Sequence, residues 1–291
     1  MASIKEYNRK LSSLKNTVKI TKTMKMVSAS KLRRAQEAEN RAQAYAHAVN
    51  NLIYRIAESV EQEMHPLLTP HASRKKVLLL VFSSDKGLCG GFNNNLIKYV
   101  EAKRAELLAK GREVQMAFCG RRGFLHFSDR AEVFKHYEGV TATPHSRDAT
   151  EISEDLIEAF INEQVDEVHM VYNHFASPLS QVPTMDQLLP LPMATLQDHD
   201  MVEHIQEEEF IAEPQLPELL ETLVPMLVVF KLFYGLLENA AGEHGARMTA
   251  MDNATTNANK MIDEYTLLRN RARQAAITTE LIEIISGAEA L

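Results

Sequence analysis

The residues best suited to bind a phosphate stand in a glycine-rich loop at residues 83–92. Gly87, Gly90 and Gly91 lie between a predicted strand and a predicted helix, where glycines and a helix N-terminus can cradle an anion. The spacing matches neither GxxxxGK[ST] nor GxGxxG, and a tight strand-to-helix turn requires glycine for its backbone conformation alone. We therefore expect a structural turn, with nucleotide binding as the alternative.

Histidine and cysteine are the remaining candidate ligands and nucleophiles. His169 and His174 are five residues apart, a spacing that puts two strand side chains on opposite faces, and the HExxH zinc motif does not occur. Cys89 and Cys119 form no CxxC motif, so we expect both to be small core residues. No GxSxG motif occurs either. The sequence thus predicts no catalytic site, no metal site and no cofactor.

Charge is distributed unevenly along the chain, although its net value is only −7. Residues 1–34 hold ten Lys and Arg against the single acid Glu6, whereas residues 148–230 hold eighteen acids and no Lys or Arg. Clustered cations are typical of nucleic-acid binding, but the chain is acidic overall and residues 19–34 contain no aromatic side chain for stacking on bases. We expect an acidic protein partner, with a solvated helix face and nucleic acid as alternatives.

Both ends of the chain are predicted to be long helices. No proline precedes Pro66, no glycine precedes Gly87, and the last proline is Pro225. Apolar residues recur at steps of three and four, the seam of a coiled coil. The seam residues are Ile4, Tyr7, Leu11, Leu14, Val18, Ala35, Ala38, Ala42, Tyr45, Val49, Leu52 and Ile56, then Leu227, Phe230, Tyr234, Leu237, Ala241, His244, Met248, Met251, Thr255, Ala258, Ile262 and Tyr265. We expect an antiparallel coiled coil of the two ends that extends beyond the domain between them.

The middle of the chain has the pattern of an α/β domain. Buried strands are predicted at 76–82, 114–118 and 168–172, helices at 93–109 and 152–161, and an edge strand at 182–191. The predicted fold is an antiparallel coiled coil with an inserted Rossmann-like α/β domain. Its parts are a shaft helix at 1–65, the central domain at 75–195 and a second shaft helix at 215–291.

No segment is expected to enter a membrane. The charged first ten residues have no apolar stretch behind them, which argues against a signal peptide. The longest apolar run, 226–237, is interrupted by Lys231 and is shorter than the roughly 20 residues that span a bilayer. We expect this run to be a buried helix face.

Four motifs resemble those of one known family. They are KNTVKITKTMKMVSASKLRRAQ at 15–36, DKGLCGGFN at 85–93, GEHGARMTAMDNATTNA at 242–258 and NRARQAAITTELIEI at 270–284. In this order and over the whole chain, they are similar to the γ subunits of F-type ATP synthases of the bacterial type.

The resemblance implies a central rotary shaft without a catalytic site of its own. The shaft would couple ion translocation through a membrane ring to ATP chemistry in a ring of three α and three β subunits. Its other partners would be the ε subunit and the c-subunit ring, with membrane contact only through that ring. The implied location is peripheral, at the cytoplasmic face of the inner membrane. A nucleotide-binding α/β protein with coiled-coil arms stays the alternative.

The motif match also assigns contact residues. Those expected to meet the β subunits are Lys22, Met24, Lys25, Glu243, Arg247, Arg273, Gln274 and Thr278. Those expected to meet the c ring are Phe210 and Glu213.

Four positions depart from the family pattern. Lys25 stands where many members have an acid, and Ala212 where many have an aromatic ring. Gly242 and Gly245 replace better helix formers, so we expect local flexibility or unusually close packing there.

Overall fold

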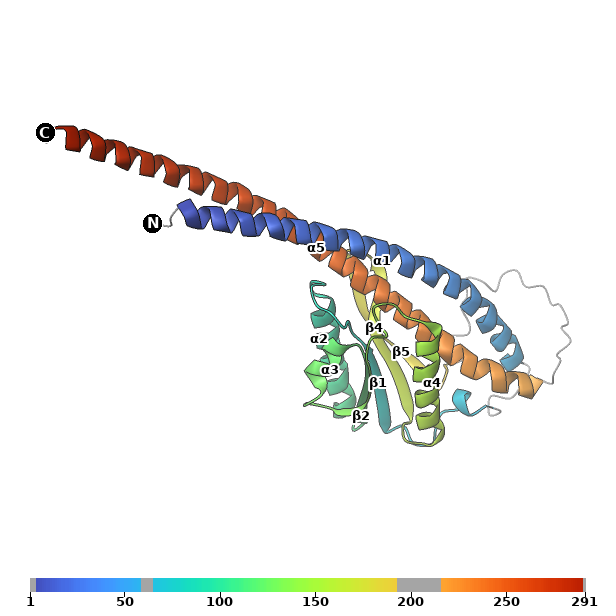
Figure 1. Ribbon diagram of the computed structural model, residues 1–291. Helices are drawn as coiled ribbons and strands as arrows, with labels where there is room; N and C mark the ends of the chain where they lie inside the picture. The colour runs from blue at the N-terminus through green and yellow to red at the C-terminus, as the bar shows by residue number, and fades with distance from the viewer. Residues whose placement is uncertain (1–3, 59–64, 193–215, 290–291) are drawn as a thin grey trace. The chain divides into compact units, whose positions relative to one another are not determined.

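The computed structural model describes residues 4–58, 65–192 and 216–289, and the chain divides into two compact units. Residues 1–29 and 247–291 form the coiled-coil unit, and residues 30–246 form the sheet unit. Helices α1 (Ile4–Glu58, 55 residues) and α5 (Leu216–Glu289, 74 residues) each contribute to both units (Figure 1). The boundary between the units therefore falls inside the helices, whereas the predicted parts 1–65, 75–195 and 215–291 follow secondary structure.

In the coiled-coil unit the two helices run antiparallel. The Thr21 and Thr255 hydroxyls are 2.7 Å apart, and the rings of Tyr7 and Tyr265 are 6.3 Å apart between centroids. As the residue numbers rise along α1, the residue numbers of the contact partners on α5 fall. Leu11 is buried, as are Ala258 and Met251 of the opposite seam. The predicted antiparallel coiled coil is confirmed.

The sheet unit is built on a mixed five-stranded sheet of order β3-β2-β1-β4-β5. Its strands are β1 (Lys76–Phe82), β2 (Glu113–Cys119), β3 (Glu132–Tyr137), β4 (Glu167–Ser177) and β5 (Ser180–Leu189). Strands β1 to β4 are parallel to one another, and β5 returns antiparallel along β4 as the expected edge strand. The inserted α/β domain is thereby confirmed.

Alternate residues of β1 face two different cores. Val77, Leu79 and Val81 pack with α2 (Phe92–Ala109) and α3 (Arg121–Phe127). Leu78, Leu80 and Phe82 instead pack with α4 (Ser146–Ile161), α5 and the short 3₁₀ helix η2 (Pro66–Leu68). A strand that is buried on both faces has a continuous run of apolar residues in its sequence. The run at 76–82 therefore predicted both ends of β1 correctly.

Some elements of the sheet unit were missed or predicted too short. Neither α3 nor β3 was expected. Helix α3 has only seven residues, and β3 is an edge strand with a single fully buried residue, Tyr137. Helix α4 begins at Ser146 rather than at residue 152, because the Asp148 carboxylate accepts the backbone N–H of His145 in a capping box.

By length and composition, α5 contains one stretch that passes the criteria for a membrane span, a window of mean hydropathy 1.8 within Glu218–Ser286. Buried helices of globular cores pass the same test. Several of its apolar side chains belong to the core shared with β1 and α4: Leu220, Val224, Leu227, Val228, Leu232 and Leu236. The predicted buried helix face is confirmed.

Candidate functional site

Three predicted contact residues lie on α1 in the coiled-coil unit. Lys22 is exposed, whereas Met24 and Lys25 are partly buried. Lys25 Nζ donates to Asp252 Oδ1 of α5 at 2.6 Å. Lys25, which stands where many family members have an acid, therefore forms an ion pair within the coiled coil. Lys22, by contrast, presents its ammonium to solvent.

Three more predicted contacts lie further along α5. Arg273, Gln274 and Thr278 are all exposed. The Thr278 hydroxyl donates to the carbonyl oxygen of Gln274 at 2.9 Å, so it is directed back onto its own helix. Positions 274 and 278 are one helical turn apart and share a face, where a partner would meet both side chains together.

Two predicted contacts have a different environment. Arg247 exposes only 9% of its surface and Glu243 only 2%. Charged side chains are almost never fully buried unless they are paired, so both need partners within the folded chain. The predicted c-ring contacts Phe210 and Glu213, together with Ala212, lie outside the described residues.

A basic groove runs between the two helices of the coiled-coil unit. It has a volume of about 520 Å³ and contains three cations, Lys15, Lys19 and Arg269, without an acid. Its remaining lining residues are Asn8, Leu11, Ser12, Asn16, Ile262 and Thr266. The predicted basic face of α1 is thus extended by a cation of α5 that sequence reasoning did not single out.

The coiled-coil unit also carries exposed apolar side chains that sequence reasoning missed. On α1 these are Ile20, Met26 and Val27, and on α5 they are Met261, Leu267, Leu268, Ile277, Leu281, Ile282, Ile284 and Ile285. Large apolar side chains that gather on a surface mark interaction sites. The available signal was their position off the coiled-coil seam, where a solvated helix would carry polar residues.

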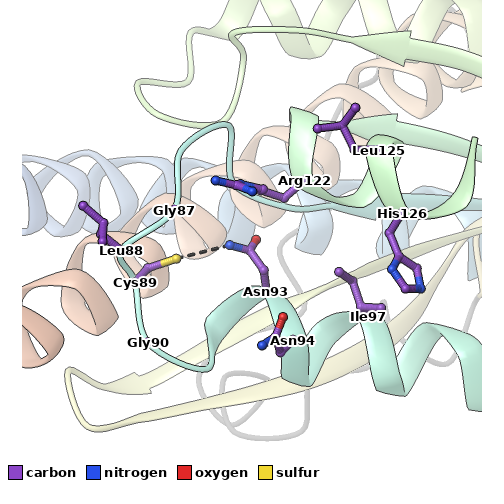
Figure 2. Close-up of a pocket in the computed structure, with 10 residues that line it drawn as sticks. All are labelled: Gly87, Leu88, Cys89, Gly90, Asn93, Asn94, Ile97, Arg122, Leu125 and His126. Carbon is purple, nitrogen blue, oxygen red and sulfur yellow. Dashed lines mark hydrogen bonds between the residues drawn. The ribbon is translucent and has the colours of Figure 1, made fainter.

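The glycine-rich loop lines a cavity of about 420 Å³ beside α2 and α3 (Figure 2). Its polar groups are largely used within the fold. Asn93 Nδ2 donates to Ser84 Oγ at 2.7 Å and to Cys89 Sγ at 3.2 Å, while Asp85 Oδ1 accepts the backbone N–H of Arg121 at 3.1 Å. These bonds join the loop to the first turns of both helices. The geometry favours a structural turn.

Helix α5 packs over the carboxyl ends of β1 and β4, the crevice where open α/β sheets usually bind ligands. A Cβ on Gly235 would lie 3.0 Å from Phe82 Cε2, and one on Gly242 would lie 3.1 Å from Phe92 Cε2. At Gly245 the corresponding distance to Phe175 Cε2 is also 3.1 Å. The close packing expected at Gly242 and Gly245 is confirmed, and it brings the helix backbone onto the sheet.

Burial controls the largest pKa shifts, and these groups belong to the core. Burial raises the pKa of the Cys119 thiol well above its usual value, and it lowers the pKa of Lys231 to about 8 against the attraction of Asp186. Both cysteines are buried, as predicted. In the described part of the chain, no three His, Cys, Asp or Glu side chains are placed to hold a metal ion.

Comparison with known proteins identifies the family. The family described as ATP synthase matches residues 3–291. A protein of Trichlorobacter lovleyi named ATP synthase gamma chain is 43% identical, and its namesake from Geobacter metallireducens is 44% identical; each match covers 100% of this chain and 99% of the relative.

Solved structures show the same fold. A chain from the rotor of the Euglena gracilis mitochondrial ATP synthase matches with a TM-score of 0.61 at 16% identity, over 94% of this chain and 98% of that one. A chain from the OSCP/F1/c-ring structure of the same enzyme matches with a TM-score of 0.67 at 18% identity, over 99% of this chain and 94% of that one. With full-length relatives well above 30% identity, the chain belongs to the ATP synthase gamma chain family.

Proposed function

We propose that this gamma chain is the central rotary stalk of an F-type ATP synthase and couples ion translocation to ATP synthesis and hydrolysis. The observation that carries the proposal is the coiled-coil unit, whose paired helices expose cations and large apolar side chains on a single framework. In a solvated coiled coil these large apolar side chains would be exposed to water. In a shaft inside a ring of subunits they would be covered by the partners.

The mechanism rests on stiffness and asymmetry. A rotating shaft transmits torque only if its two helices keep their register, which the Thr21–Thr255 and Lys25–Asp252 contacts favour. It drives chemistry in identical neighbours only if each one meets a different face at a given angle. Lys22 on α1 and Arg273 on α5 are charged groups of this kind, each suited to an acidic loop of a β subunit.

The chain has no catalytic site of its own in this proposal. The reaction takes place in the β subunits, of which three alternate with three α subunits around the stalk. The ε subunit and the c ring are the other partners, and Phe210 and Glu213 are the proposed c-ring contacts. The chain then lies at the cytoplasmic face of the inner membrane, as a peripheral protein that reaches the membrane only through the c ring.

The test is a double substitution of two exposed contacts. Arg273→Ala with Gln274→Ala should slow ATP hydrolysis by the assembled complex at least about threefold, because an arginine anchor in an interface is lost. Arg147→Ala is the matched control, since it removes an exposed arginine from α4 of the sheet unit. Circular dichroism checks that the purified chains fold.

Unchanged hydrolysis in the double variant would count against the assigned contact. An equal loss in Arg147→Ala would show that the general loss of positive charge, rather than the change at this part of α5, slows hydrolysis.

A further inference from the structure

The basic groove of the coiled-coil unit collects positive charge from both helices. Lys15 and Lys19 of α1 and Arg269 of α5 line it, and no acid does. The two lysines are four residues apart, so they lie one above the other on the same face of α1. Like charges at this spacing repel each other, and Arg269 adds a third cation to the same groove. Two helices thus build one region of positive potential.

The three cations of the groove have no ionic partner among the described residues. The coiled-coil unit does form an ion pair between Lys25 and Asp252, but neither residue lines the groove. Arg269 Nη2 donates to Asn270 Oδ1 at 3.1 Å, and this acceptor is neutral. The acids at 263–264 are exposed and lie outside the lining. The described part of the chain therefore leaves the charge of the groove unbalanced.

The other polar side chains of the groove add hydrogen-bond donors. Asn8, Ser12 and Asn16 line it along α1. Their amide and hydroxyl groups donate as well as accept, whereas the Lys and Arg side chains only donate. The apolar lining residues are Leu11 and Ile262. A ligand that is negatively charged and accepts many hydrogen bonds fits this set better than a neutral or apolar ligand does.

The size of the groove suits a small molecule. Its volume of about 520 Å³ lies within the roughly 300–1,000 Å³ of typical ligand sites. Lys15 and Lys19 are about 6 Å apart along the axis of α1, since a helix rises about 1.5 Å per residue. A chain of linked phosphates carries charge over a comparable length, whereas a chloride ion or a single carboxylate does not. The fork of Arg269 also matches the geometry of phosphate oxygens, and lysine binds phosphate as a point charge.

We propose that this groove is a binding site for a short polyphosphate chain, either free or as the phosphate tail of a nucleotide. Lys15 and Lys19 contact the chain from α1 and Arg269 contacts it from α5, so the bound anion joins the two helices. Mutual repulsion of three cations is replaced by their attraction to one anion. The site goes beyond the proposed function, because it takes a small ligand and uses none of the assigned subunit contacts.

Isothermal titration calorimetry of the purified full-length chain tests the site, with tripolyphosphate as the probe. An ionic strength of about 0.15 M limits electrostatic attraction to about 8 Å. Lys15→Gln with Lys19→Gln should weaken binding at least about tenfold, because two charge-assisted contacts are lost. Arg269→Gln should weaken it at least about threefold. Tripolyphosphate should also raise the melting temperature of the natural chain more than that of the double variant.

The matched control removes two cations from the opposite side of α5. Lys260 and Arg271 are exposed, and neither lines the groove. Lys260 precedes Arg269 by nine residues and Arg271 follows Ile262 by nine residues. Nine residues make about two and a half helical turns, which places both cations away from the groove. Lys260→Gln with Arg271→Gln should therefore bind tripolyphosphate within about twofold of the natural chain.

Two further probes define the ligand. ATP that binds more tightly than tripolyphosphate identifies a nucleotide, and ATP that binds equally or more weakly identifies the phosphate chain alone; both results support the site. The proposal is overturned if tripolyphosphate does not bind at about 1 mM, or if the control variant loses as much affinity as the lysine variant. It is overturned equally if a hexaglutamate peptide binds more tightly than tripolyphosphate, because the groove then recognises carboxylates. No partner subunit takes part in these measurements, so the site can fail while the proposed function holds.

Discussion

Replacing Lys231 by methionine should stabilise the chain. Lys231 interrupts the apolar run 226–237 of α5, and burial lowers the pKa of its ammonium to about 8 despite the attraction of Asp186. The charged ammonium of Lys231 therefore lowers the free energy of unfolding of the chain. Methionine has a similar length and no charge, so it should fill the same space without that cost.

The magnitude follows from proton linkage. The ordinary lysine pKa is 10.5, and each pKa unit corresponds to about 1.4 kcal/mol. A pKa lowered to about 8 thus implies a cost of about 3 kcal/mol at pH 7. The cost is full below pH 8, declines as pH rises towards the ordinary lysine pKa, and is roughly 1.4 kcal/mol at pH 9.5.

Urea unfolding at pH 7 and pH 9.5 measures the cost of the charged Lys231 at each pH. The stability advantage of Lys231→Met over the natural chain should shrink by about 2 kcal/mol from pH 7 to pH 9.5. Lys98→Met, at an exposed position of α2, should stay within about 0.5 kcal/mol of the natural chain. A Lys231→Met chain that is less stable at pH 7, or whose advantage is the same at both pH values, would refute the reasoning.

Two further predictions concern the sheet unit. Gly120→Ala should cost about 3 kcal/mol, because φ is +92° and the new Cβ would lie 2.2 Å from the carbonyl oxygen of Ser83. Gly111→Ala, at φ +74° with nothing within 4 Å, should cost only about 1 kcal/mol; equal losses of thermal stability would contradict this. Asp166→Asn should cost about 1–3 kcal/mol at pH 7. Burial raises the pKa of Asp166, but hydrogen bonds, the strongest from the Lys76 backbone, lower it overall. Its contribution is present above the unfolded pKa and is lost as pH falls through the folded one. A variant with unchanged acid unfolding would exclude that contribution.

The long helices could be predicted because sequence signals agree over their whole length. The absence of proline before Pro66 and after Pro225 permits two long helices, and the apolar seam requires them to pair. Tyr7 and Leu11 on one side, and Thr255 and Ala258 on the other, are buried or half-buried as the seam predicts. Such a pattern is strong because dozens of residues repeat one rule, so single exceptions such as Thr21 do not obscure it.

The short elements could not be predicted, because tertiary contacts define them. Helix α3 begins where the Asp85 carboxylate and the Ser84 carbonyl accept the N–H groups of Arg121 and Arg122, and Asp85 lies on a distant loop. Strand β3 pairs only with β2 and shows no clear alternation in burial. Neither feature leaves a periodic trace in the local sequence.

The candidate contacts show a similar limit. Motif similarity selects Arg247 and Arg273 alike, yet the first is buried and the second exposed. A motif does not distinguish residues that pack inside the chain from residues that contact a partner. Both kinds of role require a particular residue type at a particular position. Their exposure separates them, and exposure depends on which faces of α5 are covered.

The environment of α5 changes along its length, and this change supports the assignment of its surfaces. Residues 235–247 are buried without interruption, Glu238 and Glu243 included, whereas Leu281, Ile282, Ile284 and Ile285 are all exposed. A helix covered on every side belongs to a core, and polar side chains within it must find partners there. A helix that exposes four large apolar side chains within five residues has a surface that solvent does not stabilise. Since the described residues leave that second surface uncovered, its apolar side chains fit the enclosure by other subunits that we propose.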